Sequence, residues 1–187
     1  MDESWLSDAT LVEQVKAGDQ AAYRLLVERH YPMALRIAGR VLGTREEAED
    51  AVQETFLKLW RASDRYDASR GTFKAWIGRV VVNHCLDRRR ALKPVEALDV
   101  VGEMADDGPT PEDAAMAASR GATVAAAMDQ LPPRQRAVLA LFYGEGHSML
   151  EVAEMLELNV KAVESLLSRG RAGLRQALEP LRGEMSV

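Results

Sequence analysis

The stretch SMLEVAEMLELNVKAVESLLSRG, residues 148–170, decides the fold. Its apolar residues recur at intervals of three and four, which is typical of amphipathic helices and not of strands. Ser148 with Glu151 makes a capping-box pattern that opens a short helix. The tetrapeptide at residues 157–160 then turns the chain into a longer helix. Two helices joined by a turn this short predict a helix-turn-helix.

The longer helix, expected at residues 161–178, has an apolar line and an opposite polar face. The apolar line must face the core and consists of Val163, Leu167, Gly170, Leu174 and Leu178. The polar face carries Lys161, Ser165, Ser168, Arg169 and Ala172, with Glu164 and Arg175 on its flanks. Small residues permit close approach to a DNA major groove, where arginine can bind guanine through two hydrogen bonds. This face therefore favours DNA reading over the alternative, an ordinary solvated helix face.

Two helical lobes with an acidic segment between them account for the rest of the chain. It has 187 residues, of which 47% are hydrophobic and 28% charged, an ordinary globular composition. Residues 95–120 contain proline, glycine and a strong excess of acidic residues, without a sustained apolar period. We interpret them as a flexible linker; a solvated loop inside one domain is the alternative. The prediction is an all-α fold with a four-helix bundle-like lobe at residues 9–94 and a helix-turn-helix lobe at residues 121–180.

The composition disfavours several classes of protein. The formal net charge of −5 argues against a protein that coats nucleic acid through bulk charge. No apolar run approaches the roughly 20 residues that cross a bilayer, and the N-terminus lacks a signal-peptide pattern, so we expect a cytoplasmic protein without membrane insertion. Cys85 is the single cysteine, the histidines are scattered, and there is no Gly-rich phosphate loop. We therefore expect no metal, no cofactor, no small-molecule substrate and no catalysis.

The helix predicted after Thr44 has an exposed face in which a leucine stands among acidic residues. Its buried side combines small and apolar residues such as Ala51, Val52 and Leu59. The carboxylates of its first turn are explained by the positive end of the helix dipole. The remaining exposed residues indicate a protein docking face, and they are Asp50, Gln53, Glu54 and Leu57.

A basic stretch rich in aromatic residues follows that helix. Residues 65–93 carry eight basic residues against two acidic ones, and five of the ten aromatic residues lie within residues 56–76. Cations that follow phosphates and rings that receive unstacked bases are what single-stranded nucleic acid requires. Packing is the alternative for the rings. We assign Phe56, Trp60 and Phe73 to the core and expect Tyr66 and part of Trp76 to be open.

These motifs, in this order, resemble the bacterial extracytoplasmic-function (ECF) sigma factors over about residues 9–178. EDAVQETFLKLW at residues 49–60 is similar to the family segment that docks on the clamp helices of core RNA polymerase. RGTFKAWI at residues 70–77, with Asn83 and DRRR at residues 87–90, resembles the part that melts and reads the −10 element. LPPRQR, EVAEML and VESLLSR in the second lobe look like its −35 reader.

The resemblance implies core RNA polymerase, promoter DNA and an anti-sigma factor as partners. It implies that the docking face defined above binds polymerase. It places −10 DNA at Tyr66, Ser69, Arg70, Gly71, Thr72, Lys74, Arg79, Asn83, Arg88, Arg89 and Arg90. It places −35 DNA at Lys161, Glu164, Ser165, Ser168, Arg169, Arg171 and Arg175, with Lys161, Arg171 and Arg175 mainly on the DNA backbone.

One departure from the family concerns Glu164, which stands where many members have a basic residue. A carboxylate does not neutralise phosphate, but it can accept a hydrogen bond from a cytosine amino group. We therefore infer no −35 sequence. Two other classes remain as alternatives: a sigma mimic that titrates an anti-sigma factor without reading DNA, and a helix-turn-helix repressor. The repressor does not explain the docking face, and the mimic does not explain why the chain keeps Arg88–Arg90 and Arg169.

Overall fold

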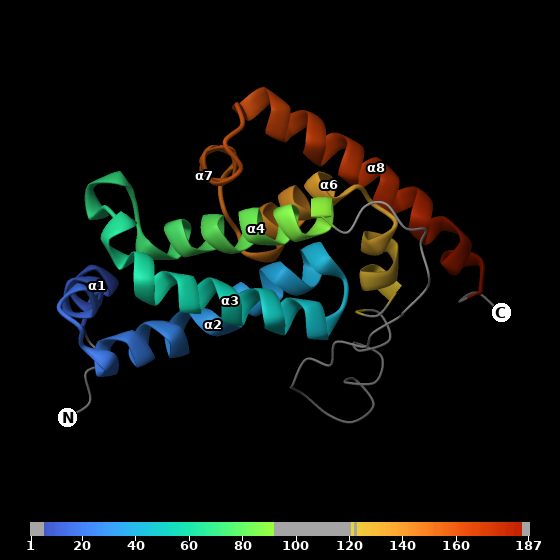
Figure 1. Ribbon diagram of the computed structural model, residues 1–187. Helices are drawn as coiled ribbons and strands as arrows, with labels where there is room; N and C mark the ends of the chain where they lie inside the picture. Colours follow the sequence, from blue (N-terminus) through green and yellow to red (C-terminus); the bar gives the residue numbers. More distant parts are fainter. Residues whose placement is uncertain (1–5, 92–120, 122, 185–187) are drawn as a thin grey trace.

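The computed structural model describes residues 6–91, 121 and 123–184, and all regular structure in these ranges is helical (Figure 1). The expected all-α fold is therefore confirmed. The segment interpreted as a linker, residues 95–120, lies outside the described residues. Among the helices described, none is long and apolar enough to cross a membrane.

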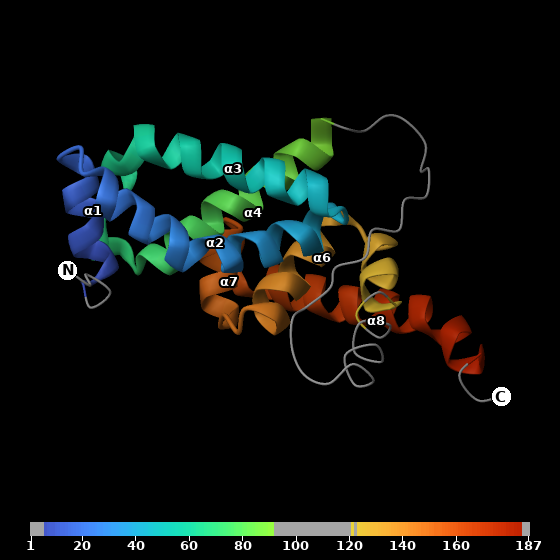
Figure 2. The same ribbon diagram turned by 90° about the horizontal axis from the view of Figure 1, so that it is seen from below.

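The first lobe is a bundle of helices that follow one another along the chain. They are α1 (Asp8–Lys16), α2 (Gln20–Leu42), α3 (Arg45–Ala62) and α4 (Phe73–Ala91). The first three begin at capping side chains, because Ser7, Asp19 and Thr44 each accept a hydrogen bond from a backbone N–H of the first turn. α2 packs against both α3 and α4, so these three helices lie side by side (Figure 2). Ile37 of α2 and Phe73 of α4 are fully buried in their shared core.

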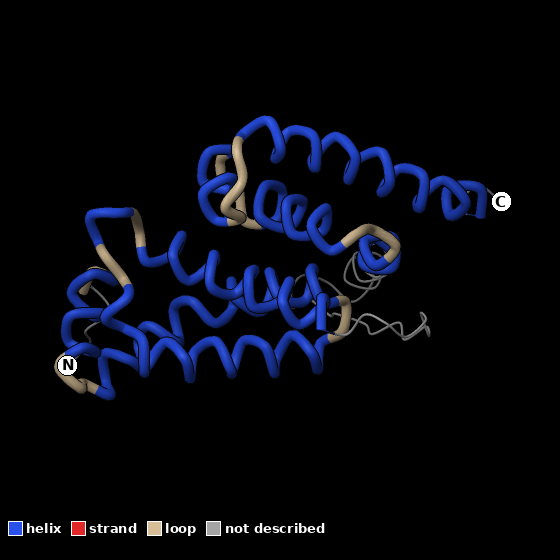
Figure 3. The backbone as a smooth tube through the Cα atoms, turned by 45° about the horizontal axis from the view of Figure 1, so that its top comes forward, coloured by secondary structure: helices blue, strands red, loops and turns tan. Residues whose placement is uncertain are grey.

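The second lobe contains a helix at residues 123–129 and the expected helix-turn-helix (Figure 3). Its further elements are α6 (Pro133–Leu139), the π-helical turn η3 (Ala140–Gly144), α7 (Met149–Met155) and α8 (Val160–Glu184). α6 does not continue as a regular helix to Tyr143, because it widens into a π turn after Leu139.

Both helices of the helix-turn-helix begin at capping side chains. Ser148 and Glu151 form the full capping box at the start of α7. The Asn159 side chain accepts a hydrogen bond from the Ala162 N–H at 2.8 Å, which explains why α8 begins at Val160, one residue earlier than expected. α8 also continues beyond the expected end at residue 178.

The two lobes pack directly on each other. α2 contacts α6 and η3, while α4 contacts α6 and α7. Buried apolar residues of both lobes form one continuous cluster. α3 lies on the side of the first lobe that is away from α7 and α8 (Figure 1, Figure 2).

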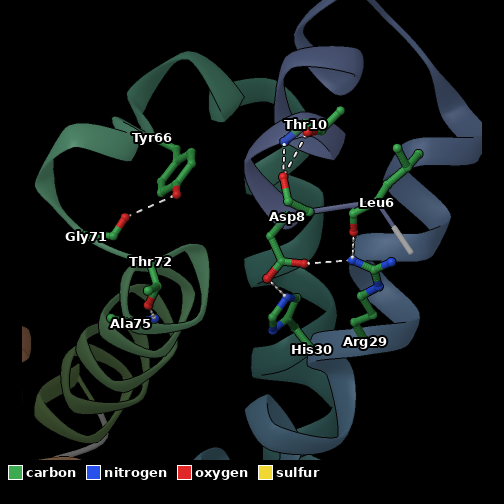
Figure 4. Close-up of polar contacts among 10 residues, drawn as sticks. Leu6, Asp8, Thr10, Arg29, His30, Tyr66, Gly71, Thr72 and Ala75 are labelled. Carbon is green, nitrogen blue, oxygen red and sulfur yellow. Dashed lines mark hydrogen bonds and ion pairs between the residues drawn. The ribbon is translucent and has the colours of Figure 1, made fainter. Parts of the chain in front are cut away.

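Cys85 and His30 are core residues. Cys85 is fully buried, and burial raises the pKa of its thiol to about 12, so it is not a reactive thiolate. His30 is buried with its Nε2 2.9 Å from an Asp8 carboxylate oxygen (Figure 4). Its ring also lies edge-on to Phe73. Within the described ranges, no group of three or more His, Cys, Asp or Glu side chains could hold a metal ion.

Candidate polymerase and nucleic-acid interfaces

The docking face of α3 has the geometry that the sequence predicted. Asp50, Gln53 and Glu54 are exposed, and Leu57 beside them is 64% exposed. The opposite side of the same helix, including Phe56, is buried. A single exposed apolar side chain is ordinary on a protein surface, but here it stands among carboxylates, which combines an apolar contact point with negative charge on one helix face. The arrangement fits a partner with an apolar contact point and surrounding cations.

Two carboxylates of the docking face are paired with α4, which sequence reasoning missed. Glu54 Oε2 lies 2.9 Å from His84 Nε2, and Glu54 Oε1 lies 3.5 Å from Arg88 Nη1. Arg88 Nη2 is also 3.8 Å from Asp50 Oδ2. Burial lowers the pKa of His84 even though Glu54 acts in the opposite direction. Part of the surface expected to dock polymerase is therefore joined to a helix expected to bind DNA. The helical pattern could not have revealed this, because it does not fix the rotation of one helix against the next.

The loop between α3 and α4 contains two 3₁₀ turns, η1 (Ser63–Arg65) and η2 (Ala68–Arg70). Asp67 accepts hydrogen bonds from the Ser69 N–H at 2.9 Å and the Ser69 hydroxyl at 2.7 Å. These bonds lower the pKa of Asp67. Gly71 has φ of 140°, a backbone conformation that favours glycine. The loop is thus held by its own hydrogen bonds before any ligand binds.

Tyr66 is only 6% exposed, so the expectation of an open ring is wrong. Its hydroxyl donates a hydrogen bond to the Gly71 carbonyl at 3.1 Å (Figure 4). Its ring lies edge-on to Phe73 and Trp76. Burial raises its pKa. Trp76 is half-buried. Tyr66 therefore shapes the loop from inside, because its ring packs better against two neighbouring aromatic rings than against water.

A groove of about 920 Å³ runs along α4. It brings together several residues expected at −10 DNA: Tyr66, Arg70, Gly71, Thr72, Arg79 and Asn83. Lys58 and Arg65 also line it, and neither was assigned a role from the sequence. Ser69, Lys74 and Arg88–Arg90 are not among its lining residues. The opposite wall comes from the second lobe, where Glu151, Glu154 and Glu157 line the same groove.

The arginines at the end of α4 are already paired with carboxylates. Arg88 contacts α3 as described above, Arg90 Nη1 lies 2.9 Å from Asp87 Oδ1, and Arg89 Nη2 lies 3.9 Å from Asp129 Oδ1. Arg90 and Asp87 are exposed, so their ion pair contributes little to stability in water. A DNA phosphate can therefore take the place of Asp87 beside Arg90. Arg88 and Arg89 are half-buried and would have to rearrange more.

The polar face of α8 is exposed as the sequence predicted. Its exposed residues are Lys161, Glu164, Ser165, Ser168, Arg169, Arg171 and Arg175. Val163 and Leu167 are buried on the opposite side. Gly170 lies so near α6 that an added Cβ would be 3.1 Å from Leu139 Cδ1, which explains a glycine on the core line. The face of α8 is free of the first lobe along its start (Figure 1).

The comparisons with known proteins agree with this layout. The family model described as Sigma-70 region 2 matches residues 26–95, and the one described as Sigma-70, region 4 matches residues 122–174. The chain is 32% identical over 180 residues to the ECF RNA polymerase sigma factor SigW of Bacillus subtilis, covering 91% of this chain and 96% of that protein. It is 35% identical over 183 residues to the RNA polymerase sigma factor CnrH of Cupriavidus metallidurans, covering 92% of this chain and 95% of that protein.

Solved structures extend the similarity over both lobes. The structure of CnrH in complex with the cytosolic domain of CnrY matches with a TM-score of 0.65 and 32% identity, covering 92% of this chain and 97% of that chain. The structure of the sigma factor RpoE with the anti-sigma factor NepR from Bartonella quintana matches with a TM-score of 0.67, covering 84% of this chain and 96% of that chain. At 21% identity, this second likeness shows the fold alone.

Proposed function

This chain belongs to the ECF RNA polymerase sigma factors, and from that premise we propose how its residues divide the work of starting transcription. A sigma factor docks on core polymerase and directs it to the −10 and −35 elements of specific promoters. The division proposed here follows the lobes: residues 9–94 dock polymerase and read the −10 element, and residues 121–180 read the −35 element.

Polymerase docking is assigned to Asp50, Gln53, Glu54 and Leu57. The observation that carries this assignment is the 64% exposure of Leu57 on a helix whose other large apolar residues are buried or half-buried. A leucine in a pocket of the partner would supply apolar burial, and the carboxylates would attract cations around that pocket. The lobe's other charged surface, along α4, is basic and suits DNA instead.

The −10 strand is assigned to the groove along α4. Arg70, Gly71 and Thr72 stand on a loop that is preordered by Asp67 and Tyr66, which suits a pocket for one unstacked base. Arg79 and Asn83 continue along the strand, and Lys58 and Arg65 add cations at the same groove. Extruding a base costs a few kcal/mol. That cost fits a protein that reads this element only within a polymerase complex.

The −35 element is assigned to the exposed face of α8. Ser165, Ser168 and Arg169 would lie in the major groove, where the short serines let the helix approach and Arg169 can contact a base edge. Lys161, Arg171 and Arg175 would contact phosphates. Glu164 would shape base preference by accepting a hydrogen bond from a cytosine amino group.

Control by an anti-sigma protein is proposed as well. The relative CnrH, which matches this chain over both lobes, is solved in complex with the cytosolic domain of CnrY. A protein that covers polymerase-docking and DNA surfaces together would block loading. We further propose that the chain acts in the cytoplasm, where transcription takes place, and that it performs no covalent chemistry itself.

Run-off transcription with core polymerase and a promoter library tests this function. The expected result is a transcript set that depends on this chain and shares two conserved promoter elements. A sigma mimic would instead bind an anti-sigma protein and yield no transcripts with any promoter. That outcome would overturn the assignment of DNA reading to α4 and α8.

A further inference from the structure

The wall of the −10 groove that comes from the second lobe is acidic. Glu151 and Glu154 of α7 and Glu157 of the turn after it line this wall, facing the basic residues that the proposed function assigns to the DNA strand. Arg79 forms an ion pair with Glu157 across this boundary. In the view of Figure 1, α7 stands directly beside α4. One of the cations intended for DNA is therefore occupied by the chain's own second lobe.

Carboxylates at this place have the same charge as the phosphates they face. A single strand that entered the groove would meet the cations of the first lobe on one side and this acidic row on the other. Like charges at short range disfavour binding, and the effect is stronger in a groove than on an open surface because water screens less there. The closed arrangement therefore lowers the affinity of the groove for DNA.

A buried carboxylate fastens the second lobe to α2. The Glu145 side chain is only 3% exposed and lies between two arginines of α2. Arg36 donates to it through Nε at 3.0 Å and Nη2 at 2.9 Å, and Arg40 donates through Nη1 at 3.1 Å. Charge-assisted, two-pronged arginine–carboxylate pairs are among the stronger polar contacts in proteins. We call this group of three residues the Glu145 clamp.

The lobes are also joined by close apolar packing. Met155 of α7 is 2% exposed and rests on Gly78 of α4 so closely that an added Cβ would lie 2.5 Å from its Cε. The glycine therefore allows α7 to approach α4. Both this contact and the Glu145 clamp hold α7 where its acidic row faces the groove.

We propose that α7 and the turn after it form an acidic lid over the −10 groove, and that the chain by itself, without any second protein, excludes single-stranded DNA until the Glu145 clamp opens. The proposal rests on the proposed function, which assigns the groove to the −10 strand. It adds that the second lobe acts as a reversible lid. Opening releases Arg79 and removes the three carboxylates from the strand's path in one movement.

The test measures the affinity of the full-length chain for a fluorescent single-stranded DNA of random sequence at low salt. Glu145→Gln removes the charge of the clamp, and Arg36→Gln with Arg40→Gln breaks the same clamp through half-exposed or exposed side chains of the other lobe. Glu13→Gln is the control, because it removes an exposed carboxylate of α1 that pairs with Lys16. Far-UV circular dichroism confirms that each variant keeps its helices.

Both clamp variants are expected to increase the radius of gyration in solution scattering and to tighten DNA binding about tenfold, because apparent affinity scales with the fraction of open molecules. The control should change neither quantity. Clamp variants that match the control in both would overturn the proposal. Variants that open without tighter binding would overturn the lid role of α7.

A further comparison separates failure of the lid from failure of the proposed function. Arg79→Ala in the opened Glu145→Gln background should weaken DNA binding if the groove is the −10 site. If it does not, the groove assignment is wrong, and the lid proposal falls with it. If it does, and the Glu145→Gln change alone has no effect on affinity, the groove assignment stands and the lid is refuted.

Discussion

Glu54 Oε2 of α3 lies 2.9 Å from His84 Nε2 of α4. Arg88, one turn further along α4, reaches the same carboxylate. A polymerase cation that approaches Glu54 would compete with both side chains. Docking would then leave Arg88 free for a phosphate, so that polymerase binding and DNA binding would support each other. Polymerase binding and DNA binding are therefore coupled through Glu54.

Replacing the docking carboxylates should separate polymerase binding from −35 reading. Asp50→Ala with Glu54→Ala should weaken binding to core polymerase about tenfold or more, because central charged contacts are removed. Arg169→Ala should leave core binding unchanged and abolish −35-dependent transcription. Core binding is measured by biolayer interferometry and transcription by run-off assay. Equal losses of core binding in both variants would contradict the division of roles.

The loop hydroxyl of Tyr66 should support both the fold and −10 reading. Tyr66→Phe keeps the ring and removes the donor to the Gly71 carbonyl, so the free energy of unfolding should fall by about 1 kcal/mol. Initiation should fall as well, since the loop around Arg70 is held less firmly. Urea unfolding and run-off transcription give the two readings. Tyr143→Phe, at an exposed tyrosine of the second lobe, is the control and should change stability little. No loss for Tyr66→Phe relative to that control would refute the role.

Two left-handed glycines form a matched pair for testing the contact between the lobes. Gly18 has φ of 89° and open space around it, whereas Gly43 has φ of 96° and a Cβ there would clash with the Asp129 carboxylate. Gly18→Ala should cost about 1 kcal/mol through backbone strain alone. Gly43→Ala should cost more, because Asp129 must move away from Arg136, with which it forms an ion pair. Urea unfolding measures the free energy of unfolding of both variants. Equal decreases would show that the contact between Gly43 and Asp129 does not contribute to stability.

Acid should destabilise the folded chain through its histidines. Burial lowers the pKa of His30, His84 and His147 from 6.5. The unfolded state therefore binds more protons than the folded state as the pH falls below 6.5. The negative charges of Glu151 and Glu145 act to raise the pKa of His147, whereas the positive charge of Lys74 lowers it further. The free energy of unfolding should therefore decrease as the pH falls below 6.5, until the lowered pKa values are passed.

Urea unfolding between about pH 7.5 and about pH 5.5 measures this dependence. His147→Gln should make the decrease less steep, because one titrating group is lost. A free energy of unfolding that stays constant or rises toward acid would contradict the assignment of neutral, buried histidines.

Local patterns were sufficient for the helices and for the exposed faces. The capping residues Ser148 and Asn159 and the spacing of Val163 and Leu167 determine where α7 and α8 lie and which side of α8 is buried, because these effects act within a few residues. The π turn after Leu139 was missed, since it depends on packing between α6 and its neighbours and not on helix period.

Contacts between distant segments could not be predicted in the same way. Tyr66 looked available from its position in a polar loop, and only its packing against Phe73 and Trp76 showed otherwise. The Glu145 clamp joins residues more than one hundred positions apart, and charge patterns along the sequence do not say which arginines meet which carboxylate. For the same reason, the acidic row of α7 was not recognised as a wall of the groove.

The affinity of the purified native chain for core RNA polymerase, compared with that of its Leu57→Asp variant, tests whether the α3 face docks polymerase. The native chain should form a specific complex, and the variant should lose affinity by about 30-fold or more, because a charge would enter the apolar contact. No measurable affinity of the native chain, or equal affinity of the two proteins, would contradict this role of the α3 face.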